Sequence, residues 1–299
     1  MTDTSYRGRF APSPTGPLHF GSLLAAVGSF LDARTCGGEW LLRMEDLDPP
    51  REVPGAADDI LRTLEAFGLN WDGDVVFQSH RHAAYRAALD QLEQTGASYP
   101  CGCTRREIQA HAGADESRQV YPGTCRDGLP AGRTARSIRL RVPDVTISFD
   151  DRLQGTCTEA PGTPSGDFIL RRADGLFAYQ LAVVVDDAAQ GITHIVRGAD
   201  LLDCTCQQIA LQRALGYPVP RYLHLPVAVN AQGEKLGKQT RAPAVNSTRA
   251  VATLCAVLDA LGQPLPPGAA DCNLDDFWEL ATAAWEVKRI PQTRSVTGR

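Results

Sequence analysis

Short apolar runs alternate with longer amphipathic segments along the chain, and turns rich in glycine and proline separate them. Short apolar runs are typical of buried strands, whereas apolar residues spaced three or four positions apart indicate helices. Proline opens and glycine closes one such segment, which starts at Pro54 and ends at Gly68. The first part of the chain is expected to contain strands at 7–10 and 39–44 and helices at 18–34, 54–68 and 80–94.

The pattern changes near residue 98, where clustered cysteines and many glycine and proline residues appear. It resumes after about residue 175. Strands that alternate with helices favour a parallel sheet covered on both faces, so we predict an α/β fold with a doubly wound parallel sheet and an inserted subdomain. Further strands are expected at 137–142, 146–149, 193–197 and 224–229, and further helices at 201–215, 247–261 and 274–285.

The 299 residues are enough for one large domain with an insertion, and 43% apolar residues support an ordinary packed core. The sequence contains no stretch of about 20 apolar residues and no signal-peptide pattern at its start. We therefore expect a cytoplasmic protein that does not contact a membrane. We also expect a monomer. We expect two halves of the sheet domain at 1–97 and 176–240, the inserted subdomain at 98–175 and a short helical extension at 241–299.

The formal net charge of −5 argues against a protein that binds nucleic acid over its whole surface. Arginines nevertheless form local groups at 105–106, 133–141 and 171–172. These groups are either solvated surface or local basic faces that contact phosphates.

A basic residue, a loop rich in proline and glycine, and a helix start follow one another between Arg9 and Ser22. The free N–H groups at a helix N-terminus attract phosphate, and Gly21 allows a nucleotide to approach the backbone closely. His19 could donate a hydrogen bond to a phosphoryl group in the transition state. The same spacing also fits a simple strand-to-helix turn with a histidine on the surface.

Lysine is rare in this chain, which has three lysines and 27 arginines. Two of the three, Lys235 and Lys238, lie three residues apart. A compact ammonium is not equivalent to the planar fork of arginine, so the pair indicates a position that requires lysine. Two ammonium groups on one loop suit a triphosphate whose charge redistributes as pyrophosphate leaves. The alternative is an exposed polar hairpin.

Together these two segments resemble the signatures of one enzyme family, the class I aminoacyl-tRNA synthetases of the glutamate type. The run RFAPSPTGPLHFGS resembles the "HIGH" signature of that family, and KLGKQ resembles the "KMSKS" loop. The runs LRMEDLDPPR, FAYQLAVVVDD and THIVRGADLL also resemble glutamate-type catalytic domains, in the same order. The resemblance covers roughly residues 7–240 and implies a Rossmann-type catalytic domain.

The resemblance also implies roles for individual residues. Glu45 would receive the ammonium of the substrate, and Arg197 would bind a planar carboxylate through its two-pronged guanidinium. Simpler explanations exist, because Glu45 could pair with Arg43 and Arg197 could form a surface ion pair. Ser22 and Gly237 depart from the two signatures, at positions where glutamate-type members vary. The implied glutamate-binding residues are Arg9, Phe10, Ala11, Pro12, Ser13, Glu45, Tyr179 and Arg197, the ATP-binding residues His19, Gly21 and Lys238, and the catalytic residues His19, Lys235 and Lys238.

Cys101, Cys103 and Cys125 lie close together in the sequence, and thiolates favour tetrahedral zinc. The fourth ligand is open from chemistry alone, because His111, Cys157 and water are conventional choices. The glutamyl-queuosine branch of the family is similar to this chain at CxC…YxxxC, which implies Tyr121. Buried free cysteines are the alternative, and ordinary helix packing explains Cys204 and Cys206.

About 60 residues follow KLGKQ, which is too few for the helical anticodon-binding region of a glutamyl-tRNA synthetase. A short core with a zinc-bearing insertion resembles the glutamyl-queuosine tRNA(Asp) synthetases. The resemblance implies activation of L-glutamate by ATP with Mg²⁺, without tRNA, and transfer to the queuosine base at the wobble position of tRNA(Asp). The alternatives are a truncated glutamyl-tRNA synthetase that charges a 3′ end, and an inactive paralogue that binds RNA.

Overall fold

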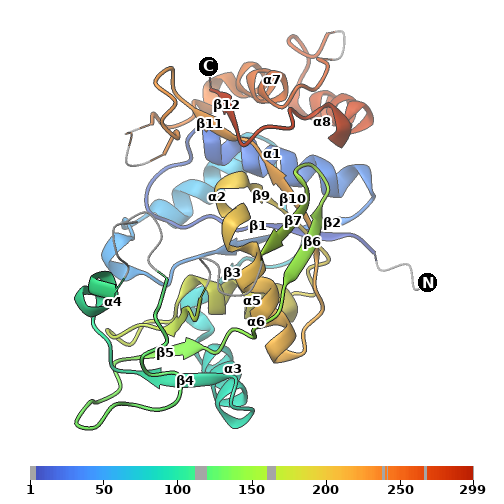
Figure 1. Ribbon diagram of the computed structural model, residues 1–299. Helices are drawn as coiled ribbons and strands as arrows, with labels where there is room; N and C mark the ends of the chain where they lie inside the picture. The colour runs from blue at the N-terminus through green and yellow to red at the C-terminus, as the bar shows by residue number, and fades with distance from the viewer. Residues whose placement is uncertain are drawn as a thin grey trace.

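The computed structural model describes residues 5–111, 120–159, 166–237, 240, 242–265 and 268–298. Its centre consists of two groups of strands that lie next to each other (Figure 1). The first group runs in the order β1-β2-β3 and is parallel throughout. Its strands are β1 (Arg7–Phe10), β2 (Glu39–Met44) and β3 (Val76–Phe77).

The second group runs in the order β7-β6-β10-β9. β10 is parallel to both β6 and β9, whereas β6 and β7 form an antiparallel hairpin. The two groups meet where β9 lies beside β1, and the Thr193 N–H donates to the Arg7 carbonyl at 2.9 Å. The strands are β6 (Ile147–Asp151), β7 (Gly155–Glu159), β9 (His194–Gly198) and β10 (Arg221–Leu225).

Helices cover both faces of these strands, which confirms the predicted fold class. On one face, α1 packs on β1, β2 and β9 and against α7 and α8. On the other face, α3, α5 and α6 pack on one another and enclose a second apolar core. The helices are α1 (Phe20–Thr35), α2 (Ala56–Ala66), α3 (His82–Gln94), α5 (Tyr179–Ala189), α6 (Thr205–Leu215), α7 (Ala250–Ala260) and α8 (Leu274–Ala284).

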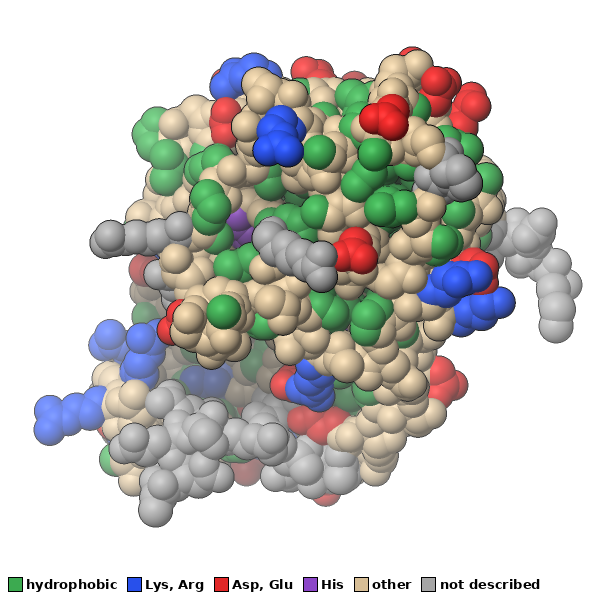
Figure 2. All heavy atoms as spheres, turned by 90° about the horizontal axis from the view of Figure 1, so that it is seen from above, with side chains coloured by type: hydrophobic (Ala, Val, Ile, Leu, Met, Phe, Trp, Pro, Cys, Tyr) green, Lys and Arg blue, Asp and Glu red, His purple; other side chains and the backbone are tan. Residues whose placement is uncertain are grey.

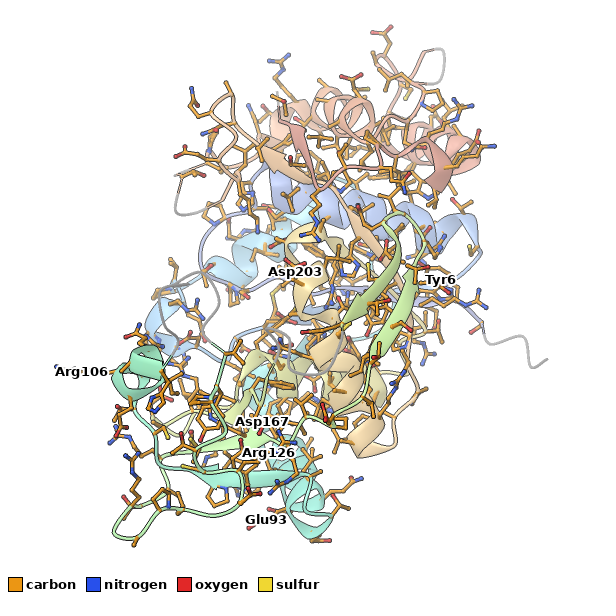
Figure 3. The ribbon with its side chains drawn as sticks, viewed as in Figure 1. Tyr6, Glu93, Arg106, Arg126, Asp167 and Asp203 are labelled. Carbon is orange, nitrogen blue, oxygen red and sulfur yellow. The ribbon has the colours of Figure 1, made fainter. Side chains whose placement is uncertain are left out.

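A small antiparallel sheet in the order β4-β5-β8 lies below the central strands in Figure 1. Asp167 holds this unit together, because its carboxylate pairs with Arg126 at 2.7 Å and accepts the Val142 N–H at 2.9 Å. Arg126 and Asp167 lie side by side in Figure 3. The unit contains β4 (Ser98–Cys101), α4 (Arg105–His111), β5 (Ser137–Leu140) and β8 (Ile169–Arg171).

The β6–β7 hairpin lies within residues 98–175, yet it extends the sheet of β10 and β9 rather than the small antiparallel sheet. The last residue of β6, Asp151, is buried beside β10. The short alternating run predicts a strand correctly, but it carries no signal for which sheet the strand joins.

The strand expected at 224–229 is wrong as a single element. Pro226 lacks an N–H and separates β10 from β11 (Val227–Val229). The C-terminal segment β12 (Ser295–Thr297) pairs with β11 in parallel, which the sequence does not predict. In the described part of the chain no helix is long and apolar enough to cross a bilayer. Short 3-10 turns cover Pro49–Arg51, Gln78–His80, Ala199–Cys204, Ser247–Arg249 and Val287–Arg289.

Candidate active site

A cavity of about 950 Å³ lies where the two groups of strands meet, beside β1 and β9. The carboxyl ends of β1, β2 and β9 reach it, which is where ligands bind in open α/β sheets. Lys238 lies outside the described residues. The cavity brings together the other predicted site residues of the catalytic domain: Arg9, Phe10, Ala11, Pro12, Ser13, His19, Gly21, Glu45, Tyr179, Arg197 and Lys235.

Arg9 is 4% exposed and is held by an acid from α5. Asp187 accepts the Arg9 Nε–H at 3.0 Å and a second bond from Arg43 at 2.8 Å. Burial opposes ionisation of Asp187, but the two guanidinium groups lower the pKa of its carboxyl. Two arginines therefore share one carboxylate, and this shared ion pair fixes the Arg9 guanidinium at the cavity wall.

Glu45 follows β2, and its backbone N–H donates to the Pro12 carbonyl at 2.9 Å. Its side chain is 10% exposed and lies 3.5 Å from Arg43, so the ion pair considered from the sequence does form. Burial raises the pKa of the Glu45 carboxyl, although Arg43 and Arg9 oppose this shift. A buried carboxylate with one distant partner keeps acceptor capacity for an ammonium group.

Arg197 differs from Arg9, because its neighbours in the structure are neutral. Its guanidinium donates to His224 at 2.9 Å, to Gln208 at 2.7 Å and to Thr205 at 2.8 Å. Among the described residues no carboxylate lies within 4.0 Å of this group, which is 5% exposed. The surface ion pair considered from the sequence is therefore wrong, and the cation stands at the cavity wall without a counter-ion from the described part of the chain.

His19 caps α1. Its Nδ1 accepts the Ser22 N–H at 3.2 Å, and the Ser22 hydroxyl accepts the His19 N–H at 2.8 Å. This reciprocal pair explains why serine suits the position where the signature has its second histidine. Because Nδ1 accepts a hydrogen bond, a neutral His19 ring carries its proton on Nε2 and is a donor there.

The loop after β11 folds back over the start of α1. A Cβ on Gly21 would lie 3.3 Å from the Leu236 carbonyl oxygen, so glycine permits this close approach. Lys235 pairs with Asp200 at 2.6 Å, and both residues line the cavity. The ammonium of Lys235 is thus held by a protein carboxylate.

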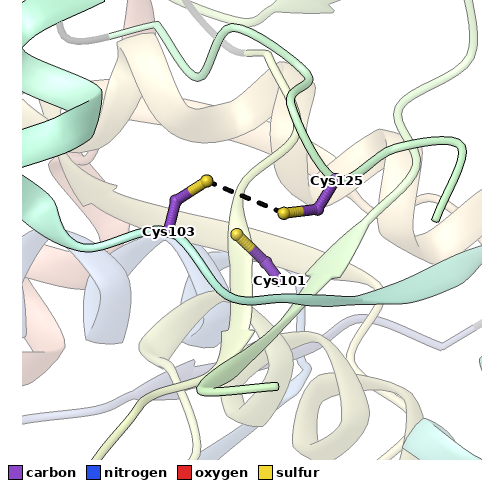
Figure 4. Close-up of side chains that lie close together, drawn as sticks. All are labelled: Cys101, Cys103 and Cys125. Atoms are coloured by element: carbon purple, nitrogen blue, oxygen red, sulfur yellow. Dashed lines mark hydrogen bonds between the residues drawn. The ribbon is translucent and has the colours of Figure 1, made fainter. Parts of the chain in front are cut away.

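A second candidate site lies in the small antiparallel unit, where Cys101, Cys103 and Cys125 converge (Figure 4). The sulfurs of Cys103 and Cys125 are 3.7 Å apart, and the Tyr121 hydroxyl lies 3.3 Å and 3.6 Å from the sulfurs of Cys101 and Cys103. Tetrahedral zinc with bonds of about 2.3 Å to sulfur and about 2.0 Å to oxygen would separate its ligands by about 3.8 Å and 3.5 Å. These four ligand atoms fit such an ion.

The surroundings of Cys101 favour its thiolate, whereas burial raises the pKa of the Cys103 thiol. Arg139 is buried, and its guanidinium carbon lies 3.8 Å from the centre of the Tyr121 ring. Burial opposes ionisation of Cys101, but hydrogen bonds with Tyr121 and Arg139 lower its pKa to about 7. His111 bonds the Glu107 carbonyl and Cys157 the Gly155 carbonyl, so within the described ranges neither joins the cluster.

The predicted arginine groups have different surroundings. Arg133 pairs with Glu107 at 2.7 Å, and Arg172 pairs with Asp174 at 2.6 Å. Arg106 and Arg136 are exposed and have no acidic partner within 4.0 Å among the described residues. Figure 3 places Arg106 on α4, at the outer edge of the small antiparallel unit. On the face drawn in Figure 2, by contrast, Lys and Arg side chains are scattered rather than gathered.

Sequence reasoning missed the roles of three residues of the cavity region. Asp187 belongs to a pair of acids in an otherwise apolar helix, which is a signal for buried ion pairs. Asp200 and Ser22 carried no comparable signal, because their roles depend on the folded positions of Lys235 and His19.

A family model described as tRNA synthetases class I (E and Q), catalytic domain, matches residues 5–252, and with the fold and the cavity it defines the class of this chain. A protein of Chromobacterium violaceum named glutamyl-Q tRNA(Asp) synthetase is 59% identical over 292 residues, which are 97% of each chain. One of Dechloromonas aromatica with the same name is 60% identical over 293 residues, again 97% of each chain. The chain belongs to the glutamyl-Q tRNA(Asp) synthetase family.

Solved structures agree on the fold. The glutamate-tRNA synthetase of Elizabethkingia anophelis has a TM-score of 0.80 at 24% identity and covers 97% of this chain, which spans 67% of that one. A glutamate tRNA ligase of Elizabethkingia meningosepticum in complex with its amino acid has a TM-score of 0.81 at 24% identity, with 99% and 67% covered. The predictions of the family and of a ligase of the aminoacyl-tRNA synthetase type are confirmed.

Proposed function

We propose that this enzyme activates L-glutamate with ATP and transfers it to the queuosine base at the wobble position of tRNA(Asp). The observation that carries the proposal is the Arg197 cation at the cavity wall, with neutral neighbours in the described part of the chain. A substrate with a side-chain carboxylate would supply the missing counter-ion. The family, whose members bear the name glutamyl-Q tRNA(Asp) synthetase, supports the acceptor.

In this proposal Arg197 binds the side-chain carboxylate of glutamate, and Glu45 binds its ammonium group. The Arg9 guanidinium, fixed by Asp187, lies against the α-carboxylate. Tyr179, at the start of α5, lines the same cavity and is 37% exposed. Residues 10–13 provide the backbone against which the adenylate rests.

The α-carboxylate of glutamate attacks the α-phosphorus of ATP, and pyrophosphate leaves. The new bond joins a glutamate oxygen to phosphorus, so the product is glutamyl-adenylate. His19 Nε2–H and the Lys238 ammonium stabilise the phosphate charge, while Mg²⁺ accompanies ATP. No side-chain nucleophile is required, because positioning and charge stabilisation supply the catalysis.

The test of activation is ATP–pyrophosphate exchange with each amino acid in turn, in the absence of tRNA. We expect exchange with glutamate. If a different amino acid supports exchange instead, or if no amino acid supports it, the assignment of the cavity as a glutamate-activating site is refuted.

Replacing His19 with asparagine separates its two roles. Asparagine is a good N-cap and can accept the Ser22 N–H, but it lacks the Nε2–H donor. We expect kcat of exchange to fall roughly 100-fold with little change in melting temperature, because a donor to developing phosphate charge is lost. Asn273→Ala is the matched control, since it removes the cap that accepts the Asp276 N–H of α8. It should lower stability by about 1 kcal/mol and leave kcat unchanged.

We also propose that Cys101, Cys103, Cys125 and Tyr121 hold one structural zinc ion. Three thiolates and a phenol form a closed tetrahedral set, which is typical of structural rather than catalytic zinc. The ion would tie β4 to the loop around Cys125 and so fix the shape of the small antiparallel unit.

Metal analysis of purified protein should find about one zinc per chain. Cys103→Ser should reduce zinc content to near zero and lower the melting temperature, because metal binding contributes to the folding free energy. Cys157→Ser and Cys204→Ser change cysteines outside the cluster and should retain the metal. Full zinc content in Cys103→Ser would show that the cluster does not bind the ion.

A further inference from the structure

Three buried polar side chains form a row across neighbouring strands behind the cavity. Asp151 ends β6, His224 lies on β10 and Arg197 on β9, where His224 and Arg197 are register partners. Their exposed fractions are 4%, 0% and 5%. Asp151 accepts from the His224 ring at 2.6 Å, and the ring contacts the Arg197 Nε at 2.9 Å.

The partners of the ring fix where its proton lies. An ionised carboxylate only accepts hydrogen bonds, so His224 Nδ1 carries the hydrogen that faces Asp151. In a neutral ring Nε2 is then an acceptor, and it receives the Arg197 Nε–H. Burial lowers the pKa of His224 and Arg197 lowers it further, against the opposing effect of Asp151. Each group in the row is therefore satisfied when the ring is neutral with its hydrogen on Nδ1.

This arrangement holds Arg197 without neutralising it. An acid in the place of His224 would fix the guanidinium equally well, but it would act as a counter-ion, as Asp187 does for Arg9. Gln208 and Thr205 complete the neutral support on the two Nη atoms, at 2.7 Å and 2.8 Å. The Asp151 charge is separated from Arg197 by the ring.

We propose that His224, oriented by Asp151, is a positioning residue that aims the Arg197 guanidinium at the side-chain carboxylate of glutamate. The inference rests on the proposed function. It assigns the discrimination of glutamate from other amino acids to a row of three residues rather than to Arg197 alone.

Asp151→Asn tests the row through the position of one proton. Asp151 Oδ1 also accepts the N–H groups of Leu153 and Gln154, at 3.0 Å and 2.8 Å, and asparagine keeps this oxygen. The His224 backbone N–H bonds Oδ2 at 3.1 Å and Oδ1 at 3.3 Å, and asparagine keeps only the Oδ1 acceptor for it. The new amide NH₂ then faces His224 Nδ1 and moves the ring hydrogen to Nε2, against the Arg197 Nε–H. We expect KM for glutamate in pyrophosphate exchange to rise roughly 10- to 100-fold, with KM for ATP unchanged.

Asp150→Asn is the matched control, because the neighbouring side chain is exposed and bonds Thr156 instead. It makes the same change of charge one residue away and should leave both KM values within about twofold of wild type, as is usual for surface substitutions. Equal KM values for glutamate in the Asp150→Asn and Asp151→Asn variants would overturn the proposal.

A second pair of variants covers the case in which Asp151→Asn does not fold. In His224→Gln the amide oxygen reaches the position of Nε2 and can accept from Arg197. In His224→Asn the shorter side chain reaches Asp151 but not Arg197. We expect KM for glutamate to be at least about tenfold higher in the asparagine variant than in the glutamine variant, at similar melting temperatures. Equal KM values for glutamate in the two His224 variants would show that His224 has only a structural role.

Wild-type protein distinguishes the two hypotheses. If it shows no exchange with glutamate, the proposed function fails. If it does show exchange and the variants keep the wild-type KM for glutamate, the proposed function stands and the positioning role of His224 is refuted.

Discussion

Labelled glutamate is expected to attach to tRNA(Asp) that contains queuosine and not to the same tRNA without it. The cyclopentene diol of queuosine offers a hydroxyl that can attack the glutamyl carbonyl of the adenylate and release AMP, which forms an ester. Guanine at the same position offers no such hydroxyl. The expected effect is therefore all or none, and acid precipitation of labelled tRNA measures it.

Removal of the 3′ CCA end should not change this labelling. A truncated glutamyl-tRNA synthetase would instead require an intact 3′ end, so loss of labelling after trimming would support that alternative. Labelling of tRNA(Asp) that lacks queuosine would contradict the proposed acceptor in a different way.

The same assay can locate the surface that contacts the RNA. Arg106 and Arg136 are exposed and have no acidic partner within 4.0 Å in the described ranges. If Arg106 and Arg136 contact phosphates of the anticodon stem, the affinity for tRNA will fall steeply as the salt concentration rises. Replacing the two arginines with neutral residues will then reduce that salt dependence. Activation of glutamate without tRNA would be unaffected.

The features that the sequence predicts well are local ones. The strand, loop and helix start between Arg9 and Ser22 depend on residues that are neighbours in the chain, and the structure places them as expected. The CxC cluster is local as well, because Cys101 and Cys103 flank the end of one strand. Periodicity predicts most of the helices for the same reason.

The features that cannot be predicted from the sequence depend on residues far apart in the chain. β12 pairs with β11 across about 65 intervening residues, and a run of three residues gives no periodic signal. In the sequence, His224 is one polar residue within an apolar strand and gives no sign of a partner. Its role becomes visible only when β6 and β9 place Asp151 and Arg197 on either side of it.

Arg197→Leu is expected to abolish the preference for glutamate. Wild-type enzyme should use glutamate over glutamine by roughly 1000-fold or more in kcat/KM, because glutamine would leave the buried guanidinium without a counter-ion. Leucine removes that charge and should lower kcat/KM for glutamate by a similar factor, while the low value for glutamine changes little. Pyrophosphate exchange at varied amino-acid concentration measures both values.

Arg197→Lys is the informative comparison, because it keeps the charge and loses the fork. A lysine ammonium cannot bond His224, Gln208 and Thr205 at once, so we expect an intermediate loss for glutamate. If charge alone determined the choice of substrate, lysine would restore the full preference. If Arg197→Leu still prefers glutamate over glutamine by the wild-type factor, the carboxylate is bound elsewhere, and Arg9, which already shares Asp187 with Arg43, becomes the group to test.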